Sequence, residues 1–163
     1  MSKIILVFLL FTVGFAACSQ KKEQKAKPQV AVSQNEYPPI VLKFNNAKEL
    51  SAKSLEGNNI FVLFQPDCDH CQHEAVLIEQ RLGEFKDYTL YFISSAPMET
   101  IVAFGKNFHL LDKENVKFAW TSTEGVLTYY GSIPTPSIYV YSHGKLRQKF
   151  NGQTDIENIL KAL

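Results

Sequence analysis

The sequence predicts an α/β sandwich, in which helices cover a mixed β-sheet. Two observations favour this fold class. From Pro38 onward, segments with the pattern of buried strands alternate with segments of helical periodicity. The chain then finishes with the pattern of a β-hairpin followed by the start of a helix. Together these patterns place one folded domain at residues 38–163, which is an ordinary length for a single domain.

Apolar runs of strand length indicate the strands. Residues 60–64 read Ile-Phe-Val-Leu-Phe, a continuous apolar run that is typical of a strand buried on both faces. The other strands are expected at residues 40–44, 88–93, 116–120, 137–141 and 146–150. Turn residues lie between the last two strands, so these form the hairpin.

Helical periodicity predicts the elements between the strands. A helix is expected over residues 69–82, where Gly83 follows as a suitable stop. Two more helices are expected at residues 98–106 and 124–130, and a short helix or turn at 50–55. Thr154 and Glu157 have the spacing of a capping box, which predicts a final helix that continues to Leu163.

The first 17 residues have the pattern of a cleaved leader. Lys3 precedes an apolar run over residues 4–17, which is short for a membrane span but suits the core of a signal peptide. Ala16-Ala17-Cys18 then resembles a bacterial lipobox, in which cleavage occurs before the cysteine and the cysteine is acylated. A plain secretory signal with a cysteine near the cut is the alternative.

A polar segment follows the leader. Residues 18–37 are rich in Lys and Gln and lack apolar periodicity, so we expect a flexible tether that reaches roughly 25 Å. With Cys18 lipidated, this tether places the domain in the cell envelope. Ser19 stands where an Asp would resemble an inner-membrane retention signal, which favours the outer membrane.

Charge and cysteine content exclude several protein classes. The chain has 17 Lys and Arg against 16 Asp and Glu, so a strongly basic nucleic-acid binder is not expected. Three cysteines are too few for a disulfide scaffold, and because their number is odd they cannot all pair with one another. Assigning Cys18 to the lipid anchor leaves one pair.

That pair, Cys68 and Cys71, is a Cys-x-x-Cys motif between a buried strand and a helix. At a helix start, unpaired N–H groups and the helix dipole stabilise a thiolate on Cys68. Cys71 lies about one turn along the same face, within disulfide reach. We therefore predict a redox-active disulfide in which Cys68 is the nucleophile and Cys71 resolves the mixed disulfide.

Three neighbours are expected to tune the Cys68 thiol. A protonated His70 favours the thiolate, whereas Asp67 and Asp69 disfavour it through like-charge repulsion. The sequence leaves the net sign of these effects open.

Glu74 lies three residues after Cys71, on the helix face that carries Ala75 and Ile78. At the edge of an apolar region its pKa is expected to be raised, and its carboxylate can then accept the Cys71 proton during resolution. In the alternative interpretation, Glu74 complements the helix N-terminus from solvent.

These residues resemble the active site of the thioredoxin superfamily, and most closely the TlpA/ResA-type thiol–disulfide oxidoreductases that work outside the cytoplasm. Members of that group carry Cys-x-x-Cys-x-x-Glu at a strand-to-helix junction, which Cys68, Cys71 and Glu74 match. Their second signature is a cis-proline just before a strand of the closing hairpin. Pro136, rather than Pro134, has that position.

The resemblance implies both a fold and roles for single residues. It implies a thioredoxin-like three-layer α/β/α sandwich with a mixed sheet, a closing β-hairpin and a C-terminal helix. It also implies that Pro136 packs beside the cysteines and that the backbone of Thr135 binds the substrate chain.

The sequence departs from thioredoxin at three places. Asp67 replaces the Trp before the first cysteine, and Val62 replaces a buried acid. The dipeptide between the cysteines is Asp-His rather than Gly-Pro, which is similar to oxidising and isomerising members. The direction of electron flow is therefore left open.

We predict a membrane-tethered enzyme that exchanges disulfides outside the cytoplasm and needs no cofactor. Its expected partners are envelope proteins that carry thiols or disulfides, together with an upstream redox partner; we expect a monomer. Three alternatives remain. Cys68, His70, Cys71 and His73 could bind zinc or copper, or the cysteines could form an inactive structural disulfide. A peroxiredoxin-like peroxidase is disfavoured, because Gln65 stands where such enzymes need a Thr.

Overall fold

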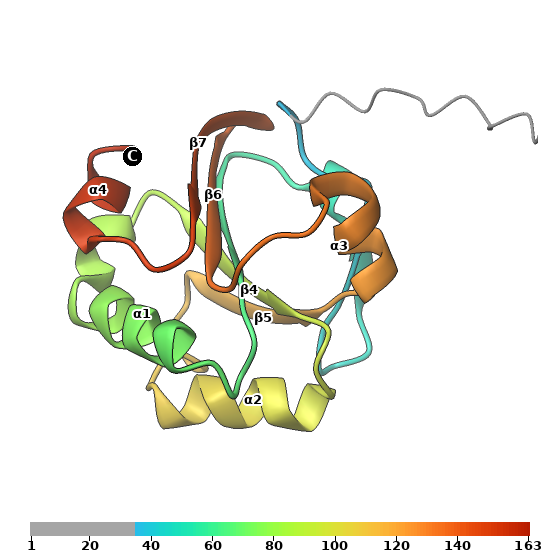
Figure 1. Cartoon of the computed structure of the whole chain (residues 1–163), viewed down its shortest axis with the longest axis horizontal. Coiled ribbons are helices and arrows are strands. Elements are labelled where there is room, and N and C mark those ends of the chain that lie inside the picture. Colours follow the sequence, from blue (N-terminus) through green and yellow to red (C-terminus); the bar gives the residue numbers. More distant parts are fainter. Residues whose placement is uncertain (1–34) are drawn as a thin grey trace, which may run out of the picture. The chain divides into compact units, whose positions relative to one another are not determined.

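A computed structural model describes residues 35–163 of the chain (Figure 1). The predicted leader, the lipidation site at Cys18 and most of the predicted tether lie outside the described residues. Within the described part of the chain, none of the helices combines the length and apolar character needed to cross a membrane.

A seven-stranded mixed sheet forms the centre of the fold, in the order β2-β1-β5-β4-β3-β6-β7. β3 and β5 are each parallel to β4, whereas β6 is antiparallel to both β3 and β7. This mixed sheet confirms the predicted fold class. The strands are β1 (Val41–Lys43), β2 (Glu49–Ser51), β3 (Asn58–Leu63), β4 (Thr89–Ser94), β5 (Val116–Trp120), β6 (Ser137–Ser142) and β7 (Lys145–Asn151).

Helices cover both faces of the sheet, which gives the predicted three layers (Figure 1). α1 (Asp69–Gln80), α2 (Met98–Asn107) and α4 (Ile156–Leu160) pack in the hydrophobic cluster on one face. α3 (Thr123–Tyr130) packs on the other face with the segment that precedes β1. β3 contributes side chains to both clusters, so this strand is buried on both faces, as its apolar run predicts.

One predicted element near the start of the domain is corrected. Instead of one helix or turn at residues 50–55, the chain forms β2 and then a 3₁₀ turn, Ala52–Ser54. β2 pairs antiparallel with β1, and the Ala52 N–H donates to the carbonyl of Ile40. These partners lie six to twelve residues away, beyond the turn-to-turn contacts of a helix, so the local pattern does not reveal them.

The predicted helix ends are also corrected. α1 stops at Gln80, and a 3₁₀ turn, Leu82–Phe85, follows and buries Phe85. The capping box at Thr154 is wrong: Asp155 caps α4, with its carboxylate accepting from the Glu157 N–H at 3.0 Å. The Thr154 N–H instead donates to the carboxylate of Glu74. α4 is also shorter than expected and ends at Leu160.

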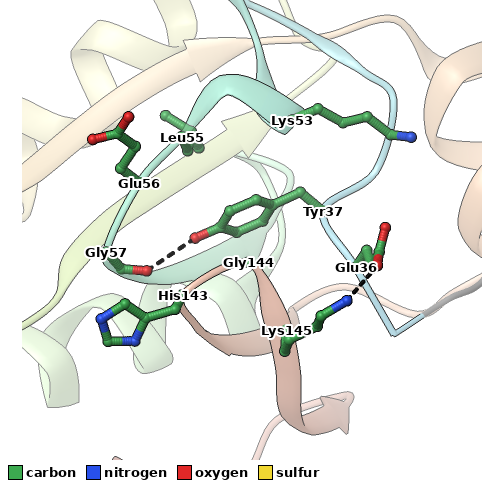
Figure 2. A pocket seen from close by; sticks show the side chains of 9 residues that line it. All are labelled: Glu36, Tyr37, Lys53, Leu55, Glu56, Gly57, His143, Gly144 and Lys145. Carbon is green, nitrogen blue, oxygen red and sulfur yellow. Dashed lines mark hydrogen bonds and ion pairs between the residues drawn. The ribbon is translucent and has the colours of Figure 1, made fainter.

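The described chain enters the fold beside the β6–β7 turn (Figure 2). The Tyr37 hydroxyl donates to the Gly57 carbonyl, and Glu36 pairs with Lys145. These contacts surround a hollow of about 450 Å³ just before β3 begins. Cys68 follows the other end of β3, so the entry point and the cysteine pair lie at opposite ends of this strand.

Candidate active site

Cys68 is the N-cap residue of α1, which is the position that the sequence predicts. Its Sγ accepts a hydrogen bond from the Cys71 N–H at 3.3 Å, one of the N–H groups that a helix start leaves without an intrahelical partner. The Gln72 N–H donates to the Cys68 carbonyl at 3.0 Å and begins the helical ladder. Both cysteines are free thiols; Cys68 is partly exposed, and Cys71 is only 2% exposed.

A loop distant in the sequence completes the surroundings of Cys68. The Thr135–Pro136 peptide bond is cis, which confirms Pro136 rather than Pro134 as the cis-proline. The Cys68 thiol donates to the Thr135 carbonyl at 3.5 Å, and the Thr135 hydroxyl lies 3.7 Å from the same sulfur. The backbone of Thr135 therefore lies directly at the nucleophile, where its predicted role in substrate binding requires it.

The two thiols have opposite pKa shifts. Burial raises the pKa of the Cys68 thiol, but hydrogen bonds from Cys71, the Thr135 hydroxyl and the His70 backbone together hold it below its ordinary value. Burial, followed by the hydrogen bond to Cys68, raises the pKa of Cys71 to about 12. Cys68 is thus the thiol that ionises first, as expected for the nucleophile.

The three predicted tuning residues are exposed, and other groups make the main contributions to the Cys68 pKa. The largest contributions to the Cys68 pKa come from burial and hydrogen bonds rather than from the Asp67 or Asp69 carboxylates. The Nδ1 atom of the His70 ring lies 2.6 Å from Oε1 of Gln153. His70 acts on Cys68 through its backbone instead.

Glu74 is fully buried, with 0% of its surface exposed, so the solvent-facing interpretation is wrong. It lies on the same buried face of α1 as Cys71 and Ala75. Oε2 accepts from the Thr154 N–H at 3.2 Å, whereas Oε1 has no hydrogen-bond partner among the described residues. Burial, reinforced by the charge of Asp155, raises the pKa of Glu74 to about 7 despite the Thr154 bond. The predicted upward shift is confirmed.

An apolar hollow of about 150 Å³ lies beside Thr135 at the carboxyl ends of the central strands. Val126 and Leu127 of α3 and Ile133 line it, and Thr135 is shared with the Cys68 site. Leu127 is exposed. Sequence reasoning missed this hollow, because the short apolar pattern of α3 does not reveal which part of the sheet the helix covers.

The residues proposed for the alternative functions do not converge. Within residues 35–163, no group of three or more His, Cys, Asp or Glu side chains is arranged to hold a metal ion. His73 is exposed. The amide of Gln65 faces the hydroxyls of Ser94 and Ser95, at 3.3 and 3.5 Å, in place of the Thr that a peroxidase needs.

Comparisons with solved structures agree on the fold. A secreted disulfide oxidoreductase from Mycobacterium tuberculosis, homologous to DsbE of E. coli, matches with a TM-score of 0.60 at 13% identity, over 76% of this chain and 93% of that one. StoA from Bacillus subtilis matches with a TM-score of 0.58 at 15% identity, over 77% and 96% of the two chains. Copper-bound ScoI from Arabidopsis thaliana gives 0.60 at 16% identity, over 77% and 96%.

No protein-family model matches the chain, and no curated protein matches it. At these identities the similarity shows the fold alone. The described part of the chain has a thioredoxin-like fold, as its resemblance in sequence to that superfamily implies. Its cysteine pair and its cis-proline lie together at the start of α1.

The Thr135 hydroxyl gives a direct test of how the nucleophile is stabilised. We expect Thr135→Val to raise the pKa of Cys68, because one hydrogen bond to the thiolate is lost. A bond of about 1 kcal/mol corresponds to roughly fivefold slower alkylation at a pH below the pKa. Iodoacetamide alkylation against pH, followed by mass spectrometry, measures this change. Thr123→Val is the matched control, and an equal effect in both variants would contradict the assigned contact.

Proposed function

We propose that this protein is a thiol–disulfide oxidoreductase that exchanges disulfides with partner proteins outside the cytoplasm. The asymmetry of the thiol pair carries the proposal: Cys68 is accessible with a lowered pKa, and Cys71 is buried with a raised one. Exchange needs one thiol that attacks a partner and a second that is protected until the mixed disulfide forms. A purely structural disulfide does not require one thiol to be more accessible and to have a lower pKa than the other.

The chemistry balances as two successive exchanges. The Cys68 thiolate attacks one sulfur of a partner disulfide, and the partner's other sulfur leaves as a thiolate that takes up a proton. Cys71 then loses its proton and attacks the Cys68 sulfur. The partner departs with two thiols, and Cys68 and Cys71 become a disulfide after giving up two electrons. A dithiol of an upstream redox protein restores the pair, and the reverse sequence oxidises a partner.

Glu74 is proposed to accept the proton that Cys71 loses. It lies one helical turn from Cys71 on the same buried face. One of its carboxylate oxygens has no hydrogen-bond partner among the described residues, and its pKa is about 7. A carboxyl group with that pKa exists in both forms at neutral pH, which suits proton transfer in either direction.

Thr135 and the adjoining hollow are proposed to hold the partner chain. The Thr135 backbone lies at the Cys68 sulfur, and the hollow lined by Leu127 and Ile133 begins beside it. An extended segment bound at Thr135 can therefore place an apolar side chain in the hollow while its cysteine faces Cys68.

The tether is proposed to hold the domain in the cell envelope through a lipid on Cys18, with the outer membrane favoured. Support comes from the lipobox pattern and from the entry point of the described chain, at the end of β3 opposite Cys68. A flexible tether that enters there lets the domain stand off the membrane surface. The secreted DsbE homologue with the same fold is consistent with a place outside the cytoplasm.

Titration of the thiols in defined redox buffers tests the proposal. We expect Cys68 and Cys71 to oxidise together as one two-electron couple, read by mass spectrometry after alkylation. Independent oxidation of the two thiols, or a disulfide that never cycles, would overturn it. Metal analysis of the reduced protein is the companion measurement, since stoichiometric zinc or copper lost on Cys68→Ser would favour the metal-binding alternative.

A further inference from the structure

β7 forms one edge of the sheet, and its outer side is largely unpaired (Figure 1). It is seven residues long, whereas β2 at the opposite edge has three. Among the described residues no other strand lies beyond β7. A strand of this length presents a row of backbone donors and acceptors that can pair with another extended chain.

The beginning of this outer side already accepts an extended segment. The Leu146 N–H donates to the Asn35 carbonyl at 2.8 Å, and Glu36 forms an isolated antiparallel bridge with Lys145. This contact shows that the edge is open to antiparallel pairing at its start. From Arg147 to Asn151 it has no such partner among residues 35–163.

Two hollows flank β7, one on each face of the sheet. The hollow on the α3 face has a volume of about 560 Å³, and Tyr130, Ile133 and Leu146 form its apolar part. The hollow on the α4 face has a volume of about 530 Å³ and includes Phe150. Successive side chains of an added strand point to opposite faces, so they can enter the two hollows alternately.

Beyond Lys145, whose charge is paired with Glu36, the charged side chains along this edge are positive. Arg147 and Lys149 lie on β7 and Lys161 follows α4, and no acidic residue lines either hollow. None of these three cations forms an ion pair within the described part of the chain, whereas Lys145 is paired with Glu36. Residues 35–163 as a whole have more acidic than basic side chains. The edge is therefore a local basic strip on an acidic domain.

We propose that the outer edge of β7 binds an extended acidic segment of a partner protein by strand addition. Backbone hydrogen bonds to β7 hold the segment, and alternate side chains enter the two hollows. Its carboxylates face Arg147 together with Lys149 on one face or with Lys161 on the other. This binding needs no redox step, so it does not depend on the proposed function. Asn151 at the end of β7 pairs with Ser137, which follows Pro136, so a segment bound along β7 ends near the Cys68 site.

An eight-residue peptide of alternating Glu and Val tests the proposal on the full chain. We expect the peptide to bind, with amide shifts in NMR spectra concentrated on residues 146–151. A peptide N-methylated on alternate residues should lose at least tenfold in affinity, because it cannot form the backbone hydrogen bonds along one edge. An alternating Lys and Val peptide should not bind. Binding should persist in Cys68→Ser, which separates this result from the redox proposal.

Charge variants provide the matched control. Arg147→Glu with Lys149→Glu should weaken peptide binding about tenfold or more, as two favourable charge contacts become repulsive. Lys86→Glu with Lys106→Glu makes the same change in net charge at exposed lysines outside β7 and should leave binding within twofold. An equal loss of peptide affinity in the two double variants would overturn the proposal. So would an N-methylated peptide that binds as tightly as the unmethylated one.

The NMR spectrum of the protein without peptide tests whether another segment already occupies the outer edge of β7. Protected outer-edge amides of β7 in the full chain without peptide would mean that the chain's own residues before Asn35 fill the edge. That result would replace the acidic partner and overturn the proposal, as would the absence of any binding.

Discussion

Replacing Cys68 with serine is expected to abolish disulfide exchange, and replacing Cys71 with serine is expected to trap partners as mixed disulfides. Of the two thiols only that of Cys68 is partly exposed and has a lowered pKa, so Cys68 is the group expected to make the first attack. Cys71 acts after the attack, and without it the bond to Cys68 persists. Non-reducing gels and mass spectrometry of the two variants in cell extracts measure both effects.

Cys18→Ser is the matched control for these variants, because it removes the third cysteine without touching the pair. We expect it to leave exchange in solution unchanged and to abolish lipidation and membrane association. Adducts that form through Cys71 in the Cys68→Ser variant would reverse the assigned roles. Adducts in neither variant would favour a structural disulfide.

The second large effect is expected in the pH dependence of stability, through Glu74. The folded state raises its pKa from an ordinary value of 4.5 to about 7, so the folded protein binds a proton more tightly than the unfolded chain does. The stabilisation is fully present below about pH 4.5 and is lost as the pH rises through 7. Each unit of pKa shift corresponds to ~1.4 kcal/mol, so Glu74 alone changes the free energy of unfolding by roughly 3 kcal/mol over this pH range.

Urea unfolding of the wild type and Glu74→Gln between pH 4.5 and pH 8 measures this term. We expect the variant to gain stability relative to the wild type as the pH rises, by roughly 3 kcal/mol in total, since its amide does not ionise. Glu79→Gln on the same helix should show no comparable trend, because Glu79 is only partly buried. Parallel pH profiles for the wild type and Glu74→Gln would contradict the assignment.

The same Glu74→Gln variant tests the proposed proton transfer separately. Resolution of the mixed disulfide by Cys71 should slow if the carboxylate accepts its proton. An unchanged rate of resolution, together with the stability change, would leave Glu74 a structural residue of the helix packing.

Local patterns in the sequence were sufficient to predict the fold class and the reactive pair. The apolar run of β3 and the adjacent Cys-x-x-Cys lie within a dozen residues of each other. The burial of the strand, the start of the helix and the position of both cysteines on one helix face therefore all follow from local spacing. The edge strand β2 and the cap of the last helix did not follow in this way. β2 owes its form to pairing with β1, and α4 is capped by Asp155 rather than Thr154, which is turned toward Glu74.

The sequence by itself predicted which two thiols form the reactive pair and that Pro136 adopts the cis form beside them. Only the tertiary structure decided what surrounds them, because these partners are distant in the chain. Thr135 reaches Cys68 across 67 residues, Gln153 holds the His70 ring across 83, and Thr154 binds Glu74 across 80. Burial and hydrogen bonding set a thiol or carboxyl pKa over a few ångströms of space, and spacing along the chain does not report those distances. Hydrogen bonds from backbone groups and from the loop at Thr135 therefore lower the Cys68 pKa, in place of the effects predicted for Asp67, Asp69 and the His70 ring.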